Sequence, residues 1–166
     1  MWKMGRLGLG DMLLTGQPAP VFSLPDADME SCDLADFRGK KHVVLYFYPK
    51  DGTPGCTMQA TDFSDHEQDF ARYDCVVIGV SPDDCLRHQA FRDEHGVSIR
   101  LLADTEGEAC RAYGVLVEKE TNGTKKPCIV RSTFIIDKRG TVRHALYEVQ
   151  PKGHAAEVLS LVKSLR

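Results

Sequence analysis

An uninterrupted run of aliphatic and aromatic residues, His42–Tyr48 (HVVLYFY), is the feature that most limits how this chain can fold. Such a run is typical of a strand that is covered on both faces, as in the central sheet of an α/β protein. The run stops at Pro49, and Thr53 followed by Pro54 predicts the N-cap and first residue of a helix. A second apolar run, Cys75–Val80 (CVVIGV), predicts another buried strand after that helix.

The rest of the chain continues the alternation of strands and helices. The expected elements are a helix from Pro54 to near Tyr73, a helix opened by a capping box at Ser81–Asp84 and closed by Gly96, a short helix from Thr105 to Gly114, a hairpin of Ser132–Asp137 and Thr141–Tyr147, and a C-terminal helix with apolar residues at Ala155, Val158, Leu159, Val162 and Leu165. This order predicts an α/β fold with a central mixed β-sheet flanked by helices.

Size, charge and composition indicate one globular domain. The chain has 166 residues, of which 42% are hydrophobic, so it can bury a core without metal or disulfide support. We expect a single domain over residues 16–166, preceded by an N-terminal arm of residues 1–15. A net charge of −3 argues against binding to nucleic acid or to an anionic membrane. The sequence has no apolar run long enough to span a membrane, and no A-x-A-like cleavage site follows its first residues, so we expect no secretory signal. The gaps between its six cysteines are long and irregular, which favours reduced thiols in the cytoplasm.

The junction Pro49–Cys56 (PKDGTPGC) is the strongest candidate for a functional site. In open α/β sheets, sites form beyond the carboxyl ends of strands, where loops meet the starts of helices. If Thr53 is the N-cap, Cys56 lies in the first helical turn, where unpaired backbone N–H groups favour an anion and lower the pKa of a thiol. On these grounds alone, Cys56 is either a reactive thiol or a small buried residue after a turn.

The residues around this junction resemble the active-site segment of peroxiredoxins, whose pattern P-x-x-x-T-x-x-C is present here at Pro49, Thr53 and Cys56. The longer form Y-P-K-D-x-T-P-G-C-T is typical of the bacterioferritin comigratory protein (BCP) or PrxQ subfamily. The resemblance covers nearly the whole chain from about Gly16. It includes the segments QPAPVFSLP at Gln17–Pro25, GVSPD at Gly79–Asp83, LLAD at Leu101–Asp104 and RSTFIID at Arg131–Asp137.

This resemblance implies a thioredoxin-like fold and a thiol-specific peroxidase that reduces hydrogen peroxide and organic hydroperoxides through a cysteine sulfenic acid. It implies that Cys56 is the peroxidatic cysteine, that Pro49 shields its thiolate, that Thr53 hydrogen-bonds the thiolate and the peroxide, and that Arg131 stabilises both. Preorganised donors of this kind stabilise the negative charge that develops as the O–O bond breaks. Thioredoxin or a similar thiol would be the reductant, and the chain would act as a monomer, with a weak dimer as the alternative.

The second, resolving cysteine is where the chain departs from the subfamily pattern. The subfamily often places it five residues after the peroxidatic cysteine, which is Thr61 here, or in the next helix, near Arg92. Cys85 lies two helical turns before Arg92 and therefore shares its face, so it is the first candidate for a resolving thiol. A one-cysteine mechanism is the rival, and Cys32, Cys110 and Cys128 remain further candidates. Cys75 begins a buried strand and is interpreted as a core residue.

Other functions remain as alternatives at this stage. A peroxide-responsive redox sensor or regulatory thiol protein would need a reactive Cys56 but not the surrounding donors. A thiol–disulfide oxidoreductase is disfavoured because the sequence has no C-x-x-C motif. Cys85 and His88 have a spacing that could hold a metal, but no second ligand pair accompanies them, so neither a metal nor a cofactor is expected. The remaining histidines are interpreted as surface residues.

Overall fold

The computed structural model describes residues 12–165. Its helices and strands, in chain order, are β1 (Ser23–Pro25), β2 (Ser31–Asp33), the 3-10 helix η2 (Leu34–Phe37), β3 (His42–Phe47), α1 (Pro54–Asp65), α2 (Glu67–Ala71), β4 (Cys75–Ser81), α3 (Cys85–His95), β5 (Arg100–Ala103), α4 (Glu108–Ala112), β6 (Leu116–Thr121), β7 (Thr124–Ile129), β8 (Ser132–Ile136), β9 (Val142–Leu146) and α5 (His154–Lys163). The predicted N-terminal arm, residues 1–15, lies mostly outside the described residues, and the single-domain boundary stays a prediction.

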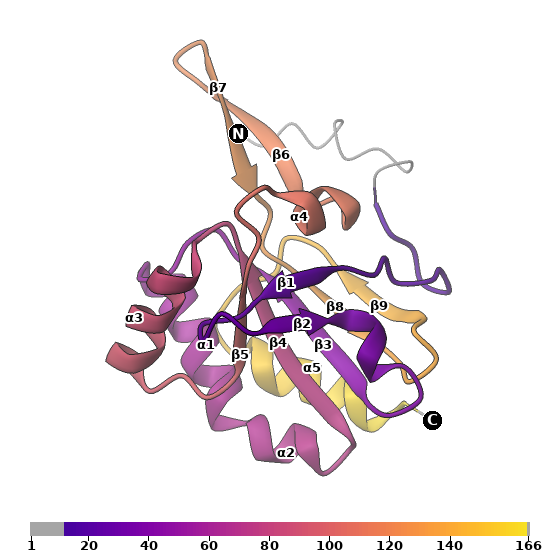
Figure 1. Ribbon diagram of the computed structural model, residues 1–166. Coiled ribbons are helices and arrows are strands. Elements are labelled where there is room, and N and C mark those ends of the chain that lie inside the picture. The colour runs from indigo at the N-terminus through magenta and orange to yellow at the C-terminus, as the bar shows by residue number, and fades with distance from the viewer. Residues whose placement is uncertain (1–11, 166) are drawn as a thin grey trace.

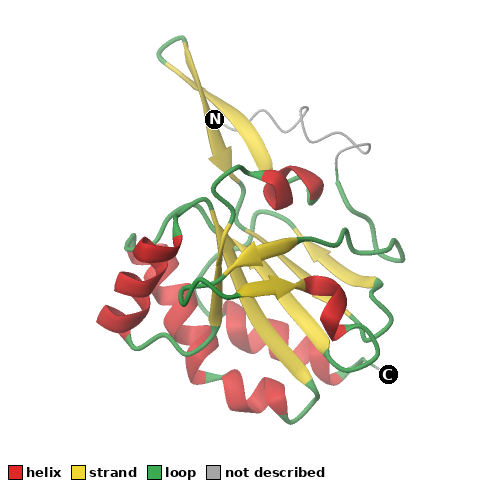
Figure 2. Cartoon of the chain, in the orientation of Figure 1, coloured by secondary structure: helices red, strands yellow, loops and turns green. Residues whose placement is uncertain are grey.

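A five-stranded sheet in the order β5-β4-β3-β8-β9 forms the centre of the molecule (Figures 1 and 2). Strands β3, β4 and β5 run parallel, whereas β8 pairs antiparallel with β3 and β9 pairs antiparallel with β8. The register places Phe47, at the end of β3, opposite Val80 of β4 and opposite Ser132, the first residue of β8. The expected mixed sheet with a parallel part and an antiparallel hairpin is confirmed.

Alternate residues of β3 enter two separate hydrophobic cores, as the continuous apolar run predicted. Val44, Tyr46 and Tyr48 pack with apolar residues of α1, α2, α3 and α5 on one face of the sheet. Val43, Leu45 and Phe47 pack on the other face with residues of β2, η2 and the α4 region. Gly79 of β4 lies opposite Tyr46, and a Cβ at this glycine would come within 2.8 Å of the Tyr46 ring. Glycine therefore leaves the space that the tyrosine fills beneath α1.

Three predicted helix boundaries are wrong. The helix expected from Pro54 to Tyr73 is broken at His66 into α1 and α2. The cap of α3 is Asp84, whose carboxylate accepts the backbone N–H of Arg87, whereas Ser81 is still the last residue of β4. The short helix begins after Gly107 rather than at Thr105, because Gly107 adopts the left-handed conformation that turns the chain into α4.

Several elements were not expected from the sequence. β5 supplies a third parallel strand, β1 and β2 form a small antiparallel pair, and β6 with β7 forms a hairpin that extends away from the central sheet (Figure 1). His154 was expected at the surface but is buried, and its Nε2 lies 2.8 Å from the Thr133 hydroxyl. Within residues 12–165, none of the helices combines the length and the apolar character that crossing a membrane requires.

Candidate active site

The loop between β3 and α1 places Cys56 at the end of the two central parallel strands. Tyr48 extends the pairing beyond β3, since its N–H donates to the Val80 carbonyl of β4. The loop then turns through Gly52, and the Thr53 side chain caps α1 by accepting the Cys56 N–H across 3.4 Å. The Thr53 hydroxyl donates in turn to the Lys50 carbonyl. The predicted N-cap is confirmed, and Cys56 lies in the first turn of α1, with 1% of its surface exposed.

Arg131 brings a positive charge to the Cys56 thiol. Its Nη2 lies 3.2 Å from Cys56 Sγ, and its Nη1 donates to Gln59 Oε1 across 2.7 Å. Gln59 lies one helical turn after Cys56 on the same face of α1, so the amide and the sulfur hold the guanidinium between them. The Arg131 carbonyl accepts the N–H of Val149, which ties the start of β8 to the segment after β9. The structure thus brings together the predicted Cys56 and Arg131.

Gly55 allows the guanidinium to come this close to the helix. A Cβ at position 55 would lie 3.3 Å from Arg131 Nη2 and 3.4 Å from Pro151 Cγ, which is tighter than ordinary packing. The surroundings are apolar, since Cys56 belongs to the same hydrophobic core as Tyr46 and Phe63, whose rings stack on one another. Burial, together with the nearby Cys56, holds the pKa of Tyr46 well above its usual value. Cys56 and Arg131 therefore meet in a site with little water to screen their attraction.

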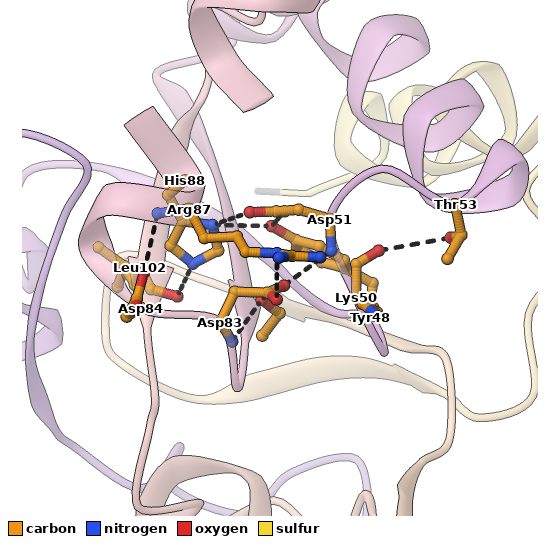
Figure 3. Close-up of polar contacts among 10 residues, drawn as sticks. Tyr48, Lys50, Asp51, Thr53, Asp83, Asp84, Arg87, His88 and Leu102 are labelled. Carbon is orange, nitrogen blue, oxygen red and sulfur yellow. Dashed lines mark hydrogen bonds and ion pairs between the residues drawn. The ribbon is translucent and has the colours of Figure 1, made fainter. Parts of the chain in front are cut away.

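A second buried network lies beside this loop (Figure 3). The Tyr48 hydroxyl donates to Asp51 Oδ1 across 2.6 Å, and His88 Nδ1 of α3 lies 2.5 Å from Asp51 Oδ2. His88 Nε2 lies 2.9 Å from the Leu102 carbonyl of β5, and the Asp51 N–H donates to Asp83 Oδ2 across 2.7 Å. The active-site loop is therefore bonded directly to α3 and to the segment between β4 and α3, and through His88 to β5.

Among residues 12–165, the same cluster contains the side chains that are close enough together to bind one metal ion. Asp51, Asp83 and His88 each offer one ligand atom, and these atoms lie within 4.8 Å of one another. Both ring nitrogens of His88 are already engaged, and the carboxylates accept a hydroxyl and a backbone N–H. Because hydrogen bonds occupy these ligand atoms, we assign no metal to the cluster.

Cys85 lies in a different surface depression from the one next to Pro49. It is the first residue of α3 and lines a hollow of about 250 Å³ that it shares with Asp84 and with residues 103–106. Its side chain is partly exposed, and burial with the carboxylates of Asp26 and Asp84 raises the pKa of its thiol. Cys56 is not among the residues that line this hollow. Cys85 is therefore accessible, but it does not touch the candidate active site in this conformation.

Pro49 borders a larger, mainly apolar cavity of about 480 Å³. The cavity lies between the active-site loop and the base of the β6–β7 hairpin, and its lining includes Lys50, Leu116, Pro127 and Cys128. Pro49 and Thr53 are both half-buried, whereas Cys56, in the first turn of α1, is buried. The shielding role expected for Pro49 stays a prediction.

The cysteines away from this loop differ sharply in their surroundings. Cys75 and Cys110 are buried, and burial raises the pKa of Cys75 to about 12. Burial, strengthened by a hydrogen bond with Asp104, raises the pKa of Cys110 well above its usual value. Burial also raises the pKa of Cys32, whereas Cys128 is only partly buried. The interpretation of Cys75 as a core residue is confirmed.

Gln59 and the pair of Asp51 with His88 are parts of this region that the sequence pattern did not predict. Gln59 carried one usable signal, because its spacing of three residues from Cys56 places it on the same face of a helix. The partnership of Asp51 with His88 had no such signal, since the two residues are 37 positions apart and belong to different elements.

The comparisons with known proteins agree with this geometry. Residues 15–145 match the model of the AhpC/TSA family. Peroxiredoxin Bcp of Bacillus subtilis is 43% identical over 150 residues, which cover 90% of this chain and 95% of that protein. Peroxiredoxin Bcp of Escherichia coli K12 is 36% identical over 151 residues, covering 91% and 96%.

Solved structures extend the similarity to three dimensions. A structure of Xanthomonas campestris bacterioferritin comigratory protein, described in terms of alkyl peroxide reduction, superposes with a TM-score of 0.83 at 34% identity and covers 86% of this chain and 90% of that one. PrxQ of Xylella fastidiosa superposes with a TM-score of 0.86 at 30% identity, covering 92% and 96%. These matches confirm the expected thioredoxin-like fold and the resemblance to the BCP/PrxQ subfamily.

The differences among the thiols predict an order of alkylation in the folded protein. At pH 8, a thiol with a pKa of about 12 is ionised in only about one molecule in ten thousand. We expect iodoacetamide to modify the partly exposed Cys85 and Cys128 well before Cys75 and Cys110, as followed by mass spectrometry of peptides. Labelling in denaturant, where all six cysteines should react, is the control. Equal rates at Cys75 and Cys128 in the native protein would contradict the assigned burial.

Proposed function

The chain belongs to the AhpC/TSA family and is a thiol peroxidase of the Bcp type, and from this premise we propose that Cys56 is the thiol that reduces the peroxide. The observation that carries the proposal is the 3.2 Å contact between Arg131 Nη2 and Cys56 Sγ in the first turn of α1. The proposed substrates are hydrogen peroxide and organic hydroperoxides. The products are water, or an alcohol and water.

The chemistry of the first step assigns a task to each neighbour. The Cys56 thiolate attacks one peroxide oxygen, an S–O bond forms, and the O–O bond breaks. The leaving oxygen takes the electron pair and a proton and departs as water or alcohol, while Cys56 becomes a sulfenic acid. Negative charge moves from sulfur to the leaving oxygen during this step, so fixed donors that face both atoms lower the barrier.

Arg131 and Thr53 are the proposed donors. Arg131 remains charged and offers several N–H groups in a rigid plane, one of which already faces the sulfur. The Thr53 hydroxyl lies at the same helix start, where it accepts the Cys56 N–H, and we propose that its proton turns from the Lys50 carbonyl, 3.4 Å away, to the peroxide. Gln59 orients the guanidinium, and Pro49 is proposed to keep water away from the thiolate. The redox-sensor alternative is not favoured, since this set of donors serves peroxide cleavage and the similar proteins are named peroxiredoxins.

Regeneration requires a thiol. In a two-cysteine cycle, a second cysteine attacks the sulfenic acid, water leaves, and the resulting disulfide is reduced by a dithiol. We propose thioredoxin or a similar thiol protein as this reductant, and Cys85 as the resolving residue. Cys85 is partly exposed at a helix start and lines a hollow that does not include Cys56, so we propose that the first turn of α1 or of α3 unwinds to bring the two Cα atoms within the roughly 7 Å that a disulfide requires. The one-cysteine cycle, in which an external thiol attacks Cys56 directly, remains the competing candidate.

We further propose that the protein works in the cytoplasm as a monomer, with a weak dimer as the alternative. Support comes from the six cysteines, all of which are free in the structure. Reduced thiols are typical of proteins in a reducing compartment. The modest net charge of −3 supports the expectation that neither nucleic acid nor a membrane surface is a partner.

Replacing the proposed nucleophile tests the assignment. Cys56→Ser should abolish peroxide consumption in the presence of thioredoxin, thioredoxin reductase and NADPH, because a serine hydroxyl is not ionised near neutral pH. The fold should persist, since the substitution changes one buried atom. Circular dichroism and thermal unfolding check the fold. Peroxide turnover close to wild type in this variant would refute the assignment.

Removing either proposed donor should slow the first chemical step. Arg131→Met and Thr53→Val should each lower the rate of sulfenic acid formation by about 10²-fold, the scale seen when one such donor is lost. The measurement is rapid-mixing kinetics with excess peroxide. Arg143→Met is the matched control, because Arg143 faces Asp137 near the far end of the sheet. An unchanged rate in either donor variant would contradict its proposed role.

Peptide mapping after one equivalent of peroxide should find a Cys56–Cys85 disulfide. Since the pKa of Cys85 is raised, its thiolate fraction is small near pH 7 and grows about tenfold for each pH unit below that pKa. The crosslink formed in a fixed time should therefore increase from pH 7 to pH 9. Absence of this peptide, together with unchanged turnover of Cys85→Ser, would refute Cys85 as the resolving residue, and absence of a disulfide from Cys56 to any other cysteine of the chain would favour the one-cysteine cycle.

A further inference from the structure

The peroxidatic loop is anchored through one acidic residue. Asp51 lies between Pro49 and Thr53, and it is 4% exposed although it carries a carboxylate. One of its oxygens faces His88 Nδ1 at 2.5 Å, and the other accepts the Tyr48 hydroxyl at 2.6 Å. These contacts connect the loop to α3 and to the end of β3 (Figure 3).

The donors and acceptors in this network can be assigned atom by atom. A backbone carbonyl can only accept, so the 2.9 Å contact with the Leu102 carbonyl places a proton on His88 Nε2. Burial holds the pKa of Tyr48 well above its usual value, so the Tyr48 hydroxyl keeps its proton and donates it to Asp51. At His88 Nδ1, the atom that faces the ring is Asp51 Oδ2, and a hydrogen bond joins these two atoms. The imidazole ring cannot rotate without losing contacts at both of its nitrogens.

Stability alone is a weak reason for burying such a pair. Taking a carboxylate and an imidazole out of water is costly, and well-packed apolar side chains often stabilise a core equally well. The position of the pair is more informative. Asp51 is two residues from Thr53, which caps the turn that carries Cys56. Side chains that fix a reacting group are themselves held by outer hydrogen bonds in well-organised sites.

We propose that His88 is a positioning residue for the peroxidase reaction, acting through Asp51 to hold the loop so that Thr53 and Cys56 keep the geometry required for attack on the peroxide. The proposal rests on the function proposed above for Cys56. His88 does not touch the reacting atoms, and its effect is transmitted by the carboxylate it orients. No metal is involved, since both ring nitrogens are engaged by protein atoms.

Two substitutions at one position separate positioning from simple packing. An asparagine amide nitrogen occupies roughly the place of a histidine Nδ1, whereas a glutamine amide nitrogen reaches the place of Nε2. His88→Asn therefore keeps a donor for Asp51, and His88→Gln keeps a donor for the Leu102 carbonyl instead. The rate of Cys56 oxidation by hydrogen peroxide, followed by quenched flow and alkylation of the remaining thiol, is the measurement.

The expected result is asymmetric. His88→Gln should slow Cys56 oxidation by about 10²-fold, the effect of a displacement near 1 Å in a reacting group, while His88→Asn should stay close to wild type. Equal slowing in both variants would show that His88 only fills space, and an unchanged rate in His88→Gln would show that the contact with Asp51 is not needed. Either result would overturn the proposal.

Substitutions on the loop side give an independent test if a His88 variant does not fold. Asp51→Ala and Tyr48→Phe should slow Cys56 oxidation in the same direction as His88→Gln. The double variant Asp51→Ala/His88→Gln should be no slower than the slower single variant, since the residues act as one unit. Unchanged rates in both loop-side variants, or fully additive losses in the double variant, would overturn the proposal.

Asp137→Ala is the matched control. Asp137, like Asp51, is a buried carboxylate, and it accepts backbone N–H groups in the turn between β8 and β9. The turn is far from the active-site loop, because the neighbouring Ile136 pairs with Val43 at the other end of β3. The Asp137→Ala substitution should lower Tm without slowing Cys56 oxidation.

The wild-type protein in the same experiment distinguishes the proposal for His88 from the proposal for Cys56. Oxidation at another thiol would refute the function proposed for Cys56, whereas oxidation at Cys56 with unaffected variants would refute only the role of His88.

Discussion

The contact between Arg131 and Cys56 joins residues that are 75 positions apart, and it depends on how β8 pairs with β3. The antiparallel register places Ser132 opposite Phe47, so Arg131 emerges beside the loop that follows β3. A slip of one residue would send the side chains of β8 to the opposite face of the sheet and remove Phe134 from its core. The register between β3 and β8, which places the apolar side chains of the sheet in their cores, therefore also sets the position of the Arg131 guanidinium.

The surroundings of this contact explain why the fold devotes buried polar groups to a single loop. Cys56 is almost completely buried, in the same hydrophobic core as Tyr46 and Phe63. In such a region, charges interact more strongly than in water, so a small displacement of the charged groups changes their interaction energy substantially. Gln59 fixes the guanidinium from one side, and Asp51 fixes the loop from the other. The site is organised before any peroxide arrives, which is how fixed dipoles contribute to catalysis.

Local interactions explain which features could be predicted from the sequence. β3 and the Thr53 cap depend on residues next to one another in the chain, and the motif that contains Cys56 is equally compact. The bond between Asp51 and His88 depends on tertiary packing, which no local pattern encodes. The β6–β7 hairpin was missed because its strands are rich in charged and polar residues and lack an alternating apolar pattern. The turn at Asn122–Gly123, where both residues have a positive φ, was the signal that could have identified it.

Trapping of the sulfenic acid tests the central assignment most directly. The wild-type chain is mixed with less than one equivalent of hydrogen peroxide in the presence of dimedone, which reacts with sulfenic acids, and the adduct is located by mass spectrometry of peptides. The geometry of Cys56, Arg131 and the first turn of α1 predicts that the adduct forms at Cys56. An adduct at Cys85 or Cys128, with Cys56 recovered as a free thiol, would contradict the account.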